Sequence, residues 1–187
     1  MLDVVKQVEE YNQLAAFLKS NDWRPGFSQL VELAAEAIES RDGLFFMGNG
    51  GSAAEATHLA AEFVGKCVVD HEPWPAISLN DSISAITAIS NDWSFDEVFE
   101  RQVRAHAKPN SLFVGLTTSG KSKNVLKALK TANSLGCRTA LLTSEQGVEY
   151  GKQFVDIILA VPSFQTPRIQ EVHLFWGHLL AEVLESR

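Results

Sequence analysis

Short apolar runs alternate with stretches of helical spacing along most of this chain, and this alternation limits the folds open to it. From Leu44 onward each run is apolar on consecutive residues and is closed by Gly, Ser, Thr, Asn or Pro, which is typical of buried parallel strands. The expected strands are Leu44–Met47, Ala76–Leu79, Leu112–Leu116, Thr139–Thr143 and Ile157–Val161. The pattern predicts an α/β fold, a doubly wound parallel five-stranded sheet flanked by helices.

The stretches around these runs carry apolar residues at helical spacing. The expected helices are an opening segment from Leu2 to Leu18, then Pro25–Glu39, Ala53–Val64, Ser82–Ile89, Asp96–Ala107, Lys123–Leu135, Gly147–Phe154 and Arg168–Glu185. Two of them precede the first strand, so we expect a single domain over 1–187 with residues 1–40 as an N-terminal helical extension. That extension either covers a face of the sheet or packs on another chain.

Composition excludes several classes of function. The 187 residues suit one domain, and a formal net charge of -7 argues against a nucleic-acid surface, which needs a basic face. No apolar run approaches the roughly 20 residues that cross a bilayer, and the first residues mix acids with apolar groups unlike a signal peptide. Cys67 and Cys137 form no CxxC motif. We therefore expect a cytoplasmic protein with no membrane partner.

The first candidate ligand loop is MGNGGS at 47–52, directly after the first expected strand and before a helix. Its three glycines allow a tight turn and a close approach of the backbone to a ligand, and Ser52 can cap the helix and offer a hydroxyl. No Gly-Lys-Ser/Thr follows at the distance that a Walker A loop requires. The loop is thus a candidate phosphate cradle of another type.

The second candidate loop is TTSGKS at 117–122, again between a strand and a helix. Four hydroxyls around one glycine at a helix N-terminus favour an anion, since free N–H groups and the helix dipole both point at it. Ser and Thr are also common at helix starts, so one such loop alone decides little. Two loops at equivalent places in the fold favour a phosphorylated ligand.

A third constellation joins two helices. His58 and Glu62 are four residues apart and share one helix face, and Gln170 and His178 lie in the last helix. Imidazole, carboxylate and amide groups could hold a divalent cation such as Zn²⁺. Gln170 and His178 would be about 12 Å apart along a regular helix, so one ion could touch both only from between them. A solvated His–Glu pair is the open alternative.

These segments carry a specific resemblance. GNGGSAAEATHLAAEF at 48–63, TTSGKSKNV at 117–125 and TPRIQEVHLFWGH at 166–178 resemble the phosphoheptose isomerases, a branch of the sugar-isomerase (SIS) domain family, and SND at 90–92 fits as well. The resemblance covers nearly the whole chain. It implies a homotetramer with N-terminal helices in the oligomer interface and active sites between subunits. It also implies isomerisation of sedoheptulose 7-phosphate to D-glycero-D-manno-heptose 7-phosphate, toward the heptose of bacterial lipopolysaccharide.

The resemblance also assigns residues. The metal site of the family, with Zn²⁺ in several members, falls on His58, Glu62, Gln170 and His178. The phosphate-binding hydroxyls fall on Ser52, Thr117, Ser119 and Ser122, with Thr118 beside them. Positions that line the sugar match Asn49 and Asp92, next to Gly50 and Gly51 of the first loop.

A ketose–aldose shift needs one group to remove a proton beside a carbonyl, giving an ene-diol, and an acid to return a proton at the neighbouring carbon. We expect Glu62 and His178 to be this catalytic pair, flanking carbons 1 and 2. A cation would polarise the carbonyl. Whether Glu62 acts mainly as ligand or as base is left open by the sequence.

Other functions fit the same fold. A relative that associates with the replication initiator DnaA is a tetrameric binding module, and other SIS domains sense a sugar phosphate without converting it. A different sugar phosphate is a further alternative. In the initiator-associating relative the positions matching Glu62 and His178 hold other residues, and a sensor needs no acid–base couple. Because both residues are present here, the sequence favours an isomerase.

Overall fold

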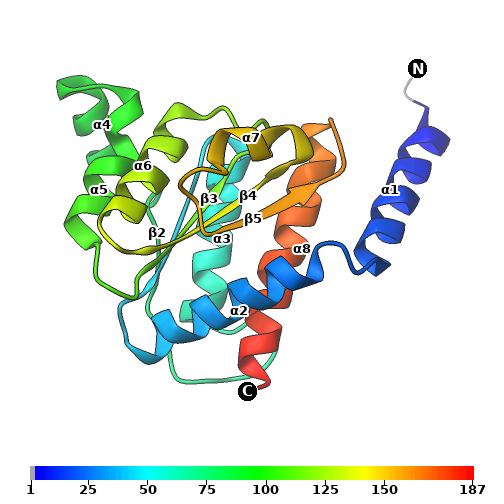
Figure 1. Cartoon of the computed structure of the whole chain (residues 1–187), viewed down its shortest axis with the longest axis horizontal. Helices are drawn as coiled ribbons and strands as arrows, with labels where there is room; N and C mark the ends of the chain where they lie inside the picture. The colour runs from blue at the N-terminus through cyan, green and yellow to red at the C-terminus, as the bar shows by residue number, and fades with distance from the viewer. Residues whose placement is uncertain (1–2) are drawn as a thin grey trace.

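The computed structural model describes residues 3–187, so Met1 and Leu2, which precede or begin the expected opening helix, lie outside it (Figure 1). Five strands form one parallel sheet in the order β2-β1-β3-β4-β5. They are β1 (Leu44–Gly48), β2 (Ala76–Ser78), β3 (Leu112–Leu116), β4 (Arg138–Ser144) and β5 (Ile157–Val161). The expected sheet is therefore confirmed.

Helices cover both faces of the sheet, as Figure 1 shows. The helices on one face are α2 (Arg24–Glu39), α3 (Gly51–Val64) and α8 (Thr166–Glu185), and those on the other are α4 (Ile83–Asp92), α5 (Val98–His106), α6 (Lys123–Ser134) and the short α7 (Val148–Gly151). The first helix, α1 (Val4–Lys19), contacts α8 through its C-terminal part and stands away from the sheet (Figure 1). Because helices cover both faces of a parallel sheet, the fold is doubly wound, as expected.

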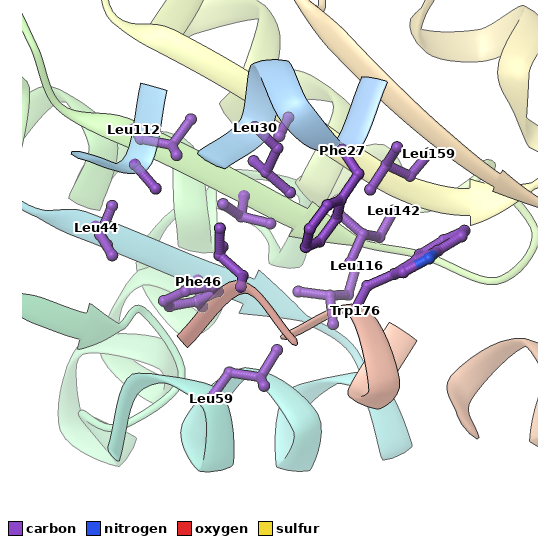
Figure 2. Packing of buried hydrophobic residues seen from close by; sticks show 14 of the residues in the cluster. Phe27, Leu30, Leu44, Phe46, Leu59, Leu112, Leu116, Leu142, Leu159 and Trp176 are labelled. Carbon is purple, nitrogen blue, oxygen red and sulfur yellow. The ribbon is translucent and has the colours of Figure 1, made fainter. Parts of the chain in front are cut away.

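The sheet is buried on both sides, which explains why its strands read as continuous apolar runs. On the α2–α3–α8 face, Phe27, Leu59 and Trp176 pack over Phe46 and Leu116, all nearly inaccessible to solvent (Figure 2). The other face has its own core, in which side chains of α5 and α6 pack on alternate residues of the same strands. Each such side chain stabilises the fold by about 1.5–3 kcal/mol. Both layers that carry the candidate loops are thus rigidly supported.

Two expected helices differ from the structure. In place of a helix over 147–154, a 3₁₀ turn, Glu145–Gly147, is followed by only four helical residues, Val148–Gly151. Gly151 lies so close to the sheet that a Cβ atom there would be 2.7 Å from Leu141, and the chain turns away after it. The expected helix over 96–107 likewise begins with a 3₁₀ turn, Phe95–Glu97, before α5.

The strand order places the candidate loops side by side. β1 lies between β2 and β3, and the chain leaves β1 through α3 on one face and β3 through α6 on the other. The carboxyl ends of β1 and β3 therefore flank the point where the winding reverses, which is where open α/β sheets bind ligands. No helix among residues 3–187 is long and apolar enough to cross a membrane.

Candidate active site

The first loop, residues 48–52, is a tight turn from β1 into α3. Gly50 has a φ of 57°, and a Cβ on Gly48 would lie 2.5 Å from the carbonyl oxygen of Ser52. A Cβ on Gly51 would lie 2.4 Å from the side-chain nitrogen of Gln170. Glycine is thus required by the turn itself, and at Gly51 it also leaves room for the Gln170 side chain to pack on the loop. Ser52 lies inside the first turn of α3, so it does not cap the helix as expected.

A pair of asparagines joins the two loops. The side-chain amides of Asn49 and Asn124 donate to each other's oxygens, both at 2.8 Å. Asn124 lies in the first turn of α6 and is only 2% exposed. The sequence analysis did not single it out, because an asparagine near a helix start is an ordinary local feature. The pair fixes the spacing of the loops across the switch point.

The second loop, residues 117–122, uses some of its hydroxyls internally. The buried Thr117 hydroxyl is 2.9 Å from that of Ser122, whereas Ser119 is exposed and accepts only the N–H of Lys121, at 3.2 Å. A Cβ on Gly120 would lie 2.3 Å from the Cα of Gly147, so this turn too needs glycine. Thr118, Ser119 and Lys121 line a hollow of about 140 Å³ with the ends of β4 and α8. Its neutral hydroxyls at the N-terminus of α6 suit an anion.

Two imidazoles and a carboxylate converge where α3 crosses α8. The Nε2 atoms of His58 and His178 are 2.8 Å apart, and Glu62 Oε1 is 3.4 Å from His58 Nε2. All three ligand atoms lie within 4.8 Å of one another. His58 is exposed and the other two are partly buried, so the group is accessible from solvent. The structure therefore brings the expected catalytic pair, Glu62 and His178, to one place.

Close packing of the two helices produces this convergence. Gly177 precedes His178, and a Cβ at Gly177 would lie 2.2 Å from the side chain of Leu59, which follows His58. Since only a residue without a side chain fits there, α8 approaches α3 closely and the two imidazoles meet edge to face, with ring centroids 5.0 Å apart.

The donor set and its spacing fit a divalent metal. Ligand atoms of a tetrahedral zinc site with Zn–N bonds near 2.1 Å are roughly 3.4 Å apart, and the observed separations of 2.8 and 3.4 Å lie near that value. Gln170, the fourth expected ligand, has its amide nitrogen 3.4 Å from the Ser52 hydroxyl and lines a hollow of about 540 Å³ together with His58. Its part in metal binding stays a prediction.

Glu55 is a buried carboxyl that the sequence analysis missed. It is 5% exposed, and neither of its oxygens has a hydrogen-bond partner among residues 3–187. Burial raises the pKa of Glu55 to about 7, against a smaller opposing effect of the nearby Ser52 hydroxyl. Ser52, Glu55 and His58 recur every three residues, so their shared helix face was the signal available in the sequence.

His173 on α8 contrasts with His178. It is fully buried, neither ring nitrogen has a hydrogen-bond partner among the described residues, and burial lowers its pKa to about 4. It is a neutral core side chain stacked near Trp176. The pKa of a catalytic imidazole has to lie nearer neutrality.

Asp92 lies apart from these groups within the chain. It is the last residue of α4, on the sheet face opposite α3 and α8, and its exposed carboxylate accepts from the Asn91 amide at 2.8 Å. The structure of one chain does not bring it beside His58, Glu62 and His178. Its expected role at the sugar therefore stays a prediction.

Comparison with known proteins gives consistent matches. The SIS domain family matches residues 9–144. The phosphoheptose isomerase of Geotalea daltonii is 41% identical over 187 residues, covering 100% of this chain and 97% of the relative. The structure of the phosphoheptose isomerase of Neisseria gonorrhoeae matches with a TM-score of 0.85 and 33% identity, covering 98% of this chain and 95% of that one. That of Francisella tularensis has a TM-score of 0.89 and 27% identity, with both chains fully covered.

Proposed function

Because the chain belongs to the phosphoheptose isomerases, a branch of the SIS-domain family, we propose that Glu62 and His178 carry out proton transfer between sedoheptulose 7-phosphate and D-glycero-D-manno-heptose 7-phosphate. The chain is an aldose–ketose isomerase of a sugar phosphate. The observation that carries the residue assignment is the convergence of Glu62 and His178 with His58.

The reaction needs only proton transfers. One member of the pair removes a proton from carbon 1 of the ketose, and the electron pair forms the C1–C2 double bond of the ene-diol while the carbonyl oxygen gains a proton. Delivery of a proton to carbon 2 and loss of the proton on the carbon 1 oxygen then give the aldehyde. No oxidant or reductant is consumed, and the carboxylate and imidazole groups on facing helices can serve both carbons.

His58, Glu62 and His178, with Gln170 as the fourth ligand, would hold a Zn²⁺ ion at this place. The bound ion would supply Lewis-acid stabilisation of the charge on the carbonyl and ene-diolate oxygens. His58, which has no part in the proton transfers, is then a ligand that also orients Glu62 from 3.4 Å.

The phosphate group belongs on the second loop. Thr118, Ser119 and Ser122, together with Ser52 of the first loop, offer hydroxyls, and the start of α6 adds backbone N–H groups and its dipole. A seven-carbon chain fixed by its phosphate at carbon 7 would present carbons 1 and 2 to the crossing of α3 and α8. Binding the remote end in this way helps to orient the reacting end.

Other parts of the proposal concern the assembly and the cell. The exposed apolar side chains Val4, Val5 and Val8 on α1 are consistent with N-terminal helices that pack between the subunits of a homotetramer. Asp92 would then reach a sugar bound between subunits. Cys67 and Cys137 are free thiols, which suits a cytoplasmic enzyme. The product would enter the synthesis of lipopolysaccharide heptose or a related conjugate.

The test is an isomerase assay with sedoheptulose 7-phosphate, on protein as purified, after chelation and after zinc is restored. We expect turnover that falls at least tenfold on chelation and returns with zinc. Absence of turnover by folded, zinc-supplied protein would refute the heptose substrate. Full turnover by protein shown to be metal-free by elemental analysis would refute the zinc site and leave the isomerase in place.

A further inference from the structure

Glu185, the last residue of α8, binds the chain that follows α3. Its carboxylate accepts the backbone N–H groups of three consecutive residues, Cys67 at 2.7 Å, Val68 at 2.9 Å and Val69 at 2.8 Å. The side chain of Glu185 is only 1% exposed. Successive N–H groups that converge on one anion form a nest, and here the anion is part of the protein itself. The reaction proposed above does not use Glu185.

The carboxylate holds residues 68 and 69 with little help from apolar burial, whereas Cys67 also packs partly against the core. Val68 and Val69 are 62% and 52% exposed, so their side chains add little to the attachment. His71 supports the same contact, since its Nε2 is 3.6 Å from Glu185 Oε1 and its ring stacks on Trp74 at 3.7 Å between centroids. The connection from α3 to β2 is therefore anchored to the end of α8 through one side chain. We name Glu185 with residues 67–69 the carboxylate clamp.

The clamp lies close to the acid–base pair along both helices. Glu185 is seven residues after His178, two helical turns on the same face of α8. Cys67 is five residues after Glu62 and three after Val64, the last residue of α3. A displacement of residue 67 therefore acts on the end of α3, two residues after Glu62.

We propose that Glu185 is a positioning residue for the isomerisation: by holding the backbone at residues 67–69, it fixes the end of α3, the helix that carries His58 and Glu62. This inference rests on the function proposed above. A purely structural Glu185 would change stability alone. A positioning residue also lowers kcat in protein that is fully folded, while KM changes little, because the loops at 48–52 and 117–122 are not part of the clamp.

The experiment compares Glu185→Gln with Glu182→Gln, an exposed residue one turn earlier on the same helix. The glutamine keeps the shape of the side chain but has one acceptor oxygen and turns N–H donors toward the nest, so the three bonds cannot all form. We expect kcat for sedoheptulose 7-phosphate to fall about tenfold with KM within twofold, and the control to match wild type. An unchanged kcat in folded Glu185→Gln, or an equal loss in the control, would overturn the proposal.

Amide hydrogen exchange over residues 65–72 separates this inference from the function on which it rests. Exchange there should be faster in Glu185→Gln than in Glu182→Gln even if the wild type converts no heptose, and equal exchange would refute the clamp. If Glu185→Gln fails to fold, Glu185→Asp takes its place, because it keeps both acceptor oxygens on a side chain shorter by one methylene group. It should lower kcat a few-fold with KM unchanged and speed exchange over residues 65–72, and an unchanged kcat would contradict the proposal.

Discussion

The crossing of α3 with α8 and the loop between β3 and α6 are built from opposite kinds of side chain. The crossing gathers ionisable groups, with His58, Glu62 and His178 at its accessible edge and the buried Glu55 one turn before His58 on α3. The loop offers neutral hydroxyls and the N-terminus of a helix, with Lys121 as its one charged side chain. Under the assignments proposed above, protons are moved at the first region and an anion is held at the second.

This contrast makes the two regions separable by kinetics. A change at the crossing should lower kcat, because groups that transfer protons stabilise the transition state more than the bound substrate. A change in the loop should act mainly on KM, because the phosphate is bound equally before and during the reaction. The contrast fails if either region changes the constant assigned to the other.

The largest expected effect is that of Glu62→Gln. The amide cannot exchange a proton, so kcat should fall about 10³-fold, within the usual range for loss of an acid–base group, with KM within threefold. Steady-state kinetics with zinc supplied measures both constants. If Glu62→Gln instead raises KM and spares kcat, the crossing serves binding and the comparison is wrong.

The crossing shows where sequence reasoning ends. The spacing of His58 and Glu62 places them on one helix face, which a local pattern is able to show. Their meeting with His178, 120 residues away, depends on how closely α8 approaches α3, and Gly177 against Leu59 determines that approach. No local sequence pattern predicts this approach, so the pairing of Glu62 with His178 was predicted from the resemblance to a family. The carboxylate clamp could not be predicted for the same reason, since it joins residues that are far apart in the sequence.

Glu55 gives the next prediction, on stability rather than rate. Its pKa is about 7 in the folded protein, against an ordinary value of 4.5, so between these values the unfolded chain loses its proton while the folded protein keeps it. The contribution of Glu55 to the stability of the fold is thus fully present below pH 4.5 and is lost as the pH rises through 7. Glu55→Gln should exceed wild type in free energy of unfolding by about 3 kcal/mol at pH 8, and by far less at about pH 4.5.

Urea unfolding at about pH 4.5, 6 and 8, with protomer concentration held fixed, measures the difference. Ser119→Ala is the matched comparison from the loop, where no buried acid is present, and its curve should run parallel to wild type. Parallel curves for Glu55→Gln as well would show that Glu55 does not carry the pH dependence, and the ionisable character of the crossing would then be confined to its exposed edge.

The fold was more predictable than the site. All five strands could be located within one residue at each end, because burial on both faces makes them continuously apolar. The helix expected over 147–154 is mostly turn, since the packing of Gly151 on Leu141 is a tertiary contact. Asn124 is similar: its reciprocal bonds to Asn49 depend on β1 and β3 being neighbours, which strand order alone provides.

The smallest expected effect tests the loop. Ser119 is exposed in the hollow, and its hydroxyl accepts only the neighbouring Lys121 N–H, so Ser119→Ala removes a donor for the phosphate and only one exposed hydrogen bond within the loop. Loss of one hydrogen bond to a charged group should raise KM about tenfold and leave kcat within twofold. Ser122→Ala is the informative control, because it also breaks the contact with the buried Thr117 and should reduce stability as well. A fall in kcat as large as the rise in KM in Ser119→Ala would mean that the loop acts in the transition state, and the division between the two regions would not hold.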